Sequence, residues 1–377
     1  MRLRISRLCV FTWRDGQMVV DDPVRHRQFA LSPHAQRLLH RFANWTDFPE
    51  TEEGGNSAVA RQLLDAHVLV AEGSAEHLGE ENLGAWAEWG TAATYYHLAT
   101  RNHRDEKFAT GAEDTDWLVE NLAARPQPPE IKEYPQAARI ALPAGCTPLP
   151  VSLEHVLRTR RTTRRLQPGT PVSGDQLATL LRWVAGPVHQ VQRPDFRPFM
   201  LKASPSPGAL HTVEVYPVVR NVTGVEPGIY HYHCVRHDLE LVVPGAVDDD
   251  LLLDWCGGQT HMRHAGAVLL YTARLDRMAW KYQTGSAYRS VFMELGHFSQ
   301  TAYLVGTALG LGMCFTAATR DEAIEEALGL DWTQEILLGV SAVGIPEPGE
   351  AARQKVMLAG GEADFSFAGD SWDGRGP

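Results

Sequence analysis

The chain lacks the features that mark secreted and membrane-spanning proteins. Its 377 residues include only five cysteines, which are scattered and form no C-x-x-C pair. Such a set favours reduced thiols in a cytosol. No uninterrupted apolar run is long enough to span a bilayer, and residues 1–16 lack the apolar core of a signal peptide. We therefore expect a cytoplasmic protein that does not enter a membrane.

Positive charge and phosphate-binding loops are also scarce. The chain has 35 Lys and Arg against 46 Asp and Glu, a net charge of -11. This balance argues against a general nucleic-acid or anionic-membrane binder. The glycine-rich stretch Gly310–Gly312 ends a predicted helix and does not form G-x-G-x-x-G, and no G-x-x-x-x-G-K-[ST] occurs. We see no internal repeat.

Residues 1–123 have the pattern of a small winged-helix-like domain. Apolar residues alternate from Cys9 to Trp13 and lead to Asp15-Gly16, which predicts a hairpin. Ser32-Pro33 predicts a helix start. A second helix over 57–67 and a strand over 68–70 follow. The aromatic segment 84–104 is predicted to be helical, and core burial is the simpler interpretation of its side chains.

A long buried helix dominates the second half of the chain. Apolar residues recur at alternating steps of four and three from Val291 to Leu309. Other sides of this segment are apolar too, so we expect it in a core or a subunit interface. Two polar residues of this helix, Glu294 and His297, are expected to be buried with partners.

The surrounding elements predict an α+β sandwich over residues 151–348. Helices are expected at 152–160 and from 174, and strands at 211–220, 228–232, 239–243, 267–272 and 336–345. A proline-rich linker (124–150) precedes this domain. A Gly-, Ala- and Asp-rich tail (349–377) follows it.

Four arginines within 160–165 could form a phosphate clamp, because guanidinium groups match phosphate oxygens. A solvated basic turn is the common alternative.

The pair Lys281-Tyr282 could act as a base, since an ammonium stabilises a neighbouring phenolate. The histidines from His231 to His237 are expected to be exposed hairpin residues and not metal ligands, because no second ligand pair accompanies them.

Four short motifs, in order, resemble one enzyme family. They are Arg-Met-Ala-Trp-Lys-Tyr (277–282), Ala-Tyr-Arg (287–289), Leu-Gly-His (295–297) and Ala-Leu-Gly-Leu-Gly (308–312). They are similar to the SagB-type FMN-dependent azoline dehydrogenases of peptide natural-product maturation, within the nitroreductase superfamily. The resemblance implies a nitroreductase-like sandwich with a long central helix and a homodimer that binds FMN between its subunits.

The resemblance also implies roles for particular residues. Arg-Arg-Thr-x-Arg is similar to the family's Arg-Arg-Ser-x-Arg, which holds the FMN phosphate and ribityl chain, and Pro-Ser-x-Gly-Ala lies against the flavin ring. Pro207 replaces a usual glycine and removes one N–H. Arg277, Tyr288 and Arg289 are expected to frame the same pocket. The expected FMN-binding residues are Arg160, Arg161, Thr162, Arg164, Pro205, Ser206, Gly208, Ala209, Leu311, Gly312, Thr316, Ala317 and Arg353.

The implied activity is dehydrogenation of thiazoline or oxazoline rings in a modified precursor peptide, with Lys281 and Tyr282 as catalytic residues. The N-terminal domain would then recognise the precursor's leader by strand addition, or it would only stabilise the protein. A complex with a cyclodehydratase is a further expectation. Two alternatives remain: an NAD(P)H-driven reductase of dehydroamino acids or small electrophiles, and a non-catalytic leader-binding scaffold.

Overall fold

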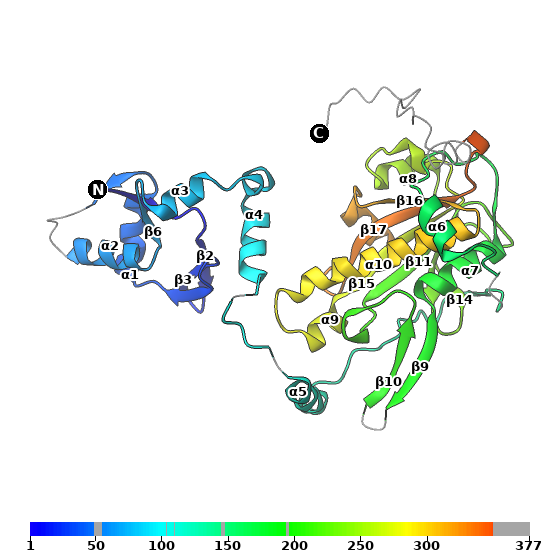
Figure 1. The fold of residues 1–377 in the computed structure, drawn as a ribbon, viewed down its shortest axis with the longest axis horizontal. Helices are drawn as coiled ribbons and strands as arrows, with labels where there is room; N and C mark the ends of the chain where they lie inside the picture. The colour runs from blue at the N-terminus through cyan, green and yellow to red at the C-terminus, as the bar shows by residue number, and fades with distance from the viewer. Residues whose placement is uncertain (49–54, 103, 109, 145–147, 194–195, 350–377) are drawn as a thin grey trace. The chain divides into compact units, whose positions relative to one another are not determined.

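The computed structural model describes residues 1–48, 55–102, 104–108, 110–144, 148–193 and 196–349. The chain forms two compact units (Figure 1). The first comprises Met1–Asp114 with Thr284–Ser286, and the second comprises residues 115–283 and those from 287 onward. No helix among the described residues is long and apolar enough to cross a membrane.

The first unit contains two small antiparallel sheets and several helices. The strand β1 (Arg2–Ile5) lies between β5 (Thr46–Asp47) and β6 (Leu69–Ala71). The meander β2 (Val10–Arg14), β3 (Gln17–Asp22), β4 (Arg27–Ala30) forms the second sheet, with β2 at its edge. The predicted hairpin is confirmed, because Asp15 and Gly16 connect β2 to β3 with positive φ.

The predicted helices of this unit are also present. Ser32 accepts a hydrogen bond from Ala35 N and begins α1 (Pro33–Leu39), which continues into η1 (His40–Phe42). They are followed by α2 (Asn56–Asp65), α3 (Ala75–Glu81) and α4 (Ala85–Thr100). The expected burial of the α4 aromatics is wrong for Trp89, which is 64% exposed. Its helix breaks at Gly90, whose φ is 80°.

The second unit is built on a seven-stranded antiparallel sheet. Its order is β16-β17-β15-β11-β13-β14-β7. The predicted central strand β15 (Ala267–Arg274) pairs with β11 (Val213–Val219) and β17 (Glu335–Gly344) along its whole length. The other strands are β13 (Gly228–His233), β14 (Asp238–Pro244), β16 (Gly312–Thr316) and β7 (Arg139–Ala141).

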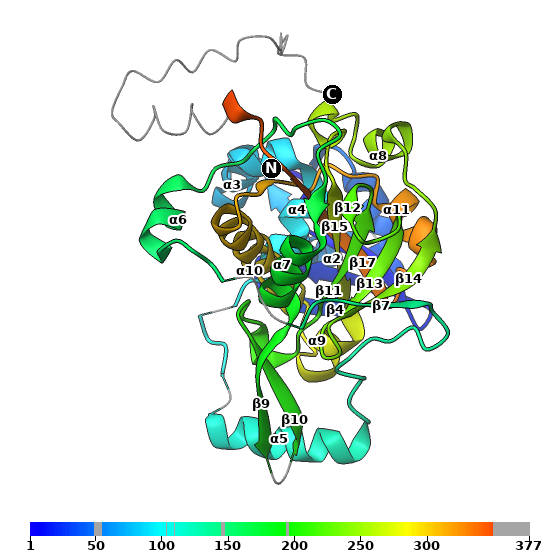
Figure 2. The same cartoon turned by 90° about the vertical axis from the view of Figure 1, so that its right-hand side faces the viewer.

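Helices cover both faces of this sheet (Figure 2). One face carries the predicted long helix, α10 (Ala287–Ala308), packed beside α7 (Gly174–Ala185). The other face carries α8 (Asp249–Trp255) and α11 (Asp321–Leu328), whose apolar side chains join Val268 and Val340 in a second core. The α+β sandwich with a long helix on one face of the sheet, predicted from the sequence, is therefore confirmed.

Several elements of this unit were not predicted. The proline-rich stretch 124–150 contributes β7, which pairs with β14 at the sheet edge. A hairpin of β9 (Pro187–Arg193) and β10 (Phe196–Lys202) extends beyond the sheet (Figure 1). The helix expected at 152–160 is confirmed as α6 (Leu153–Thr159). The other elements are α5 (Gly111–Ala124), which belongs to this unit from Thr115 onward, α9 (Leu275–Lys281), β8 (Val172–Ser173), β12 (Val222–Thr223), η3 (Pro207–Ala209) and η4 (Thr260–Met262).

Candidate active site

The arginine segment and the glycine-rich stretch, predicted separately, lie against each other. The segment leaves α6 at Arg160 and runs beside β16, where Thr163 N donates to Met313 O over 2.8 Å. A Cβ on Gly312 would lie 2.7 Å from the Thr163 methyl group. Only glycine at this position permits the close approach of the two segments.

Tyr303 of α10 joins these two segments, a role that the apolar pattern of the helix does not predict. Its hydroxyl accepts the Phe315 backbone N–H over 2.8 Å and lies 3.3 Å from the Thr162 hydroxyl. The Arg160 guanidinium stands 5.2 Å from its ring centroid, within cation–π range. The ring therefore fixes the start of the arginine segment on α10.

Arg160, Arg161 and Arg164 keep their charge available for an anion. Among the described residues, no carboxylate forms an ion pair with Arg160, Arg161 or Arg164. Arg161 donates to the carbonyls of Arg158 and Arg160, and Arg164 is exposed. Unneutralised guanidinium groups at one end of a site are typical of phosphate binding.

The proline-rich turn before β11 is held by Glu294 of α10, which is fully buried as predicted. Its carboxylate accepts hydrogen bonds from the Ser206 and Thr212 hydroxyls over 2.8 and 2.7 Å. Pro207 occupies the first turn of η3, a position where the missing N–H costs little. The expected burial of His297 is wrong: it is exposed, with Nδ1 2.9 Å from Pro205 O.

The same turn touches the Lys281-Tyr282 pair. Gly208 has a φ of 61°, and a Cβ there would lie 2.8 Å from the Tyr282 hydroxyl and 3.3 Å from Lys281 Nζ. Lys281 Nζ also stands 5.3 Å from the Tyr282 ring centroid. The structure thus brings together two groups of residues that are about 70 positions apart in the sequence.

Both halves of the site are anchored on one helix. Glu294 holds the turn and Tyr303 holds the arginine segment. The two are nine residues apart on the helix, which corresponds to about 13.5 Å at 1.5 Å per residue.

Of the other residues expected to bind FMN, Leu311 is buried and Ala317 is exposed, and the Thr316 hydroxyl accepts a hydrogen bond from Gln259 over 2.9 Å. Arg353 lies outside the described residues.

Arg277 does not frame the pocket as expected. Its guanidinium is buried, donates to His211 O over 2.6 Å and lies 2.7 Å from the Glu214 carboxylate. Burial lowers the pKa of His211 to about 3, so its ring is neutral. Arg277 therefore supports the site from the protein interior.

The expectation of exposed hairpin histidines is also wrong. His231, His233 and His237 are at most 7% exposed. His231 lies between two carboxylates, 3.2 Å from Glu214 and 2.9 Å from Glu240. Burial alone would lower the pKa of His231, but these hydrogen bonds outweigh it and raise the pKa. Among the described residues no group of side chains forms a metal site.

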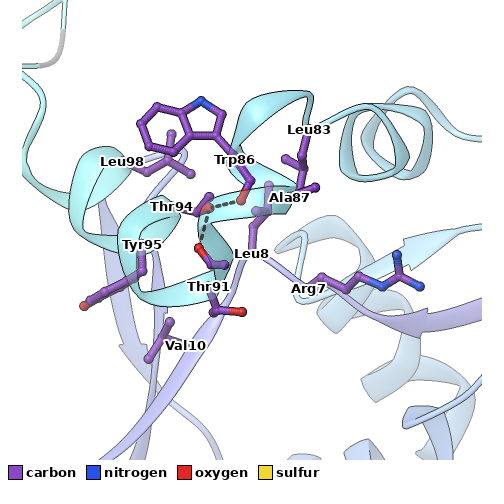
Figure 3. Close-up of a pocket in the computed structure, with 11 residues that line it drawn as sticks. Arg7, Leu8, Val10, Leu83, Trp86, Ala87, Thr91, Thr94, Tyr95 and Leu98 are labelled. Atoms are coloured by element: carbon purple, nitrogen blue, oxygen red, sulfur yellow. Dashed lines mark hydrogen bonds between the residues drawn. The ribbon is translucent and has the colours of Figure 1, made fainter. Parts of the chain in front are cut away.

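The first unit contains a separate cavity of about 180 Å³ (Figure 3). It lies between the start of β2 and the kinked helix α4. Thr94 closes the kink by donating to Gly90 O over 3.0 Å. The cavity lining is mainly apolar and includes Leu8, Val10, Leu83, Trp86, Ala87 and Leu98.

The family model described as "Nitroreductase family" matches residues 157–345, half of the chain. The chain belongs to the nitroreductase family. Members of this family are FMN-dependent oxidoreductases. The matched region includes α10, the turn before β11 and most of the sheet, so both halves of the described site lie within it.

Two individual proteins are similar to parts of the chain. MJ1384 of Methanocaldococcus jannaschii, named as a nitroreductase, is 34% identical over 178 residues, which are 47% of this chain and 84% of that protein. The trifolitoxin-processing protein TfxB of Rhizobium leguminosarum bv. trifolii is 28% identical over 42% of this chain and 44% of TfxB.

Among solved structures, a nitroreductase-like protein from Anabaena variabilis superposes with a TM-score of 0.52 at 23% identity. The match covers 67% of this chain and 47% of that protein, and it shows the fold alone. The chain therefore spans less than half the length of TfxB and of the Anabaena protein.

Proposed function

We propose that this flavin oxidoreductase dehydrogenates thiazoline or oxazoline rings in a modified precursor peptide. The contact of the Gly208 turn with Lys281 and Tyr282 carries the proposal, because it places a cation and a phenol beside a turn that can approach a planar ring. The similarity to a protein named for trifolitoxin processing supports a peptide substrate.

The residues of the site fit FMN. The guanidinium groups of Arg160, Arg161 and Arg164 would hold the phosphate, and the Thr162 hydroxyl would hold the ribityl chain. Pro205 to Ala209 and the backbone from Leu311 to Ala317 would contact the ring system. Bound FMN would supply the hydride acceptor.

Lys281 and Tyr282 would handle the proton. An azoline ring becomes an azole when it loses a proton from Cα and a hydride from Cβ, and a Cα=Cβ double bond forms. The Tyr282 oxygen takes the Cα proton, and the Lys281 ammonium stabilises the phenolate that precedes this transfer. The absence of a side chain at Gly208 leaves room for the hydroxyl beside the turn.

The first unit is suited to hold the unmodified part of the substrate. β2 is an edge strand, and an extended peptide can pair with such an edge. The cavity beside Val10 is close in size to one of about 150 Å³ that accepts benzene, and it is below the range of about 300–1,000 Å³ typical of small-molecule sites. It would therefore take one apolar side chain of the leader.

Replacement of the proposed catalytic pair tests this function. Lys281→Ala and Tyr282→Phe proteins should bind FMN normally and lose azoline oxidation by about 10²-fold or more, the range of general base contributions. The assay follows azole formation in a thiazoline-containing peptide by mass. Full oxidation rates in FMN-loaded variants would contradict the proposal.

Two outcomes would favour the alternative functions. Steady NAD(P)H consumption with an electrophilic acceptor, without azoline oxidation, would indicate a reductase. A protein without FMN affinity would indicate a scaffold. Pro207, which removes one backbone N–H, is the sequence feature in favour of a scaffold. It lies in the first turn of η3, where a missing N–H costs little.

A further inference from the structure

The segment from Asn121 to Tyr134, which we call the strap, contacts the helix that ends at Lys281 and is followed directly by Tyr282. That helix, α9, has only seven residues and no side-chain N-cap among its described contacts. So short a helix is unstable by itself and depends on tertiary contacts. The position of Lys281 and Tyr282 therefore depends on what holds α9.

The strap holds α9 at its C-terminal end. The last carbonyls of a helix lack intrahelical partners. Trp280 O, directly before Lys281, instead accepts hydrogen bonds from Asn121 Nδ2 over 3.0 Å and from Arg125 Nη2 over 3.3 Å. The Trp280 indole N–H donates to Arg125 O over 3.2 Å. Backbone and side chain of Trp280 are thus both bonded to the strap.

A second contact lies one helical turn earlier. Arg277 Nε donates to Pro129 O over 2.9 Å, while its Nη1 donates to His211 O at the end of the Gly208 turn. Arg277 and Lys281 are four residues apart and share one side of α9. The strap, α9 and the turn therefore meet through one buried guanidinium.

The far end of the strap is fixed to the sheet. Lys132 Nζ lies 2.6 Å from both the Tyr216 hydroxyl and the Glu335 carboxylate, and its side chain is largely buried. Tyr134 N donates to Glu240 over 3.1 Å. Because both ends are anchored, the strap can transmit the rigidity of the sheet to α9.

We propose that Asn121 and Arg125 are positioning residues that hold Lys281 and Tyr282 against the Gly208 turn. This inference rests on the proposed function of that pair. The two side chains touch the Trp280 carbonyl and not the reacting atoms, so they should affect the rate of proton transfer without contributing to flavin or peptide binding.

The key variant is Asn121→Asp, which keeps the shape of the side chain but removes its N–H donor. A carboxylate beside the C-terminal end of α9 is also repelled by the helix dipole. We expect kcat for a thiazoline-containing peptide to fall about tenfold, since small misplacements of catalytic groups cost this much or more. KM and FMN content should stay within about twofold.

Two controls accompany it. Glu120→Gln changes an exposed neighbour and should leave kcat unchanged. Asn121→Gln keeps an amide donor and should restore most of the rate. Hydrogen exchange of the α9 amides should increase in Asn121→Asp alone, including the Tyr282 N–H that donates to Met278 O.

A double-mutant cycle separates this inference from the proposed function. If Asn121 acts through the pair, Asn121→Asp should cost little further rate in a Tyr282→Phe background. Additive losses, an unchanged kcat, or loss of FMN with kcat retained would overturn the strap's role alone. Full rates in Lys281→Ala and Tyr282→Phe would overturn the proposed function and the inference together.

Discussion

At the scale of single residues, Gly208 determines how closely the turn approaches Tyr282. Its φ of 61° lies in the left-handed region, which glycine adopts at little cost. The space above it is filled by the Tyr282 hydroxyl and Lys281 Nζ. Glycine is therefore required here for two reasons: its backbone conformation, and the room it leaves for Lys281 and Tyr282.

Gly208→Ala should separate these two reasons when it is compared with Gly169→Ala. Gly169 has a similar φ of 68° but open space around it. Both variants should lose about 1 kcal/mol of stability from the backbone. Only Gly208→Ala should also lower azoline oxidation, by about tenfold or more, because its methyl displaces the hydroxyl. Equal rates in the two variants would show that the contact is unimportant.

His231 should make the stability of the folded protein depend on pH. Its folded pKa is raised above the ordinary 6.5, so its stabilising contribution is complete below pH 6.5 and is lost as the pH rises through the raised value. Glu240 has its pKa lowered to about 2, despite burial, by His231 and neighbouring donors. Its contribution is complete above pH 4.5 and is lost as the pH falls towards 2.

The contribution of His231 and Glu240 to the free energy of unfolding should therefore be highest between about pH 4.5 and 6.5. Urea unfolding from pH 5 to 9 should show a decline above pH 6.5 that is absent in His231→Asn. That variant should also lose about 3 kcal/mol at pH 6, since it removes the buried cation between Glu214 and Glu240 and leaves them Arg277 and Arg236 as their closest ion-pair partners. His233→Asn is the control, because its partner Glu133 is half-exposed. A His231→Asn profile parallel to the wild type would contradict this.

At the scale of elements, the spacing of apolar residues predicted the helices and strands that have a clear buried face. The long helix α10 and the strands β11, β13, β14, β15 and β17 all follow from their apolar patterns. The three-residue strand β7 and the hairpin β9–β10 do not. β7 is too short for a pattern, and its pairing with β14 is tertiary.

Sequence motifs predicted residues of the site, but they did not predict how these residues are arranged in space. The sequence identified the arginine segment and Lys281-Tyr282, yet only the fold shows that Glu294 and Tyr303 of α10 anchor the two halves. The burial of His231 was missed because its partners Glu214 and Glu240 lie on neighbouring strands, and a polar residue in a strand ordinarily faces water.

The cavity beside β2 makes a prediction for the first unit. Thr91→Trp should fill it and weaken binding of a fluorescent precursor peptide by about tenfold or more, because burial of one large apolar side chain contributes about 1.5–3 kcal/mol. FMN content should not change. Ala92→Trp adds the same side chain at an exposed position outside the cavity and is the control. Unchanged peptide affinity in Thr91→Trp would exclude this cavity as the docking site.

At the scale of the whole molecule, an apolar surface of α10 fits the homodimer expected from the sequence, which we propose here. Phe292 and Met293 are 45% and 60% exposed although they lie in the central helix of the fold. Exposed apolar residues grouped on one element mark interaction surfaces. A second copy of the chain would cover them and place its own residues beside the flavin site.

Met293→Asp should shift the protein from dimer to monomer in light scattering and lower its FMN content, because a buried unpaired charge opposes association. Leu251→Asp is the matched control. Leu251 is 42% exposed on α8, which covers the opposite face of the sheet. Dimers of normal mass in Met293→Asp would place the interface elsewhere.

The most direct test of the proposed activity is anaerobic mixing of the FMN-loaded protein with a thiazoline-containing precursor peptide. The absorption band of oxidised flavin should bleach, and the peptide should lose two hydrogen atoms by mass. Both changes should be slow in Tyr282→Phe. A band that persists with this peptide but bleaches with NAD(P)H would contradict the account and identify a reductase.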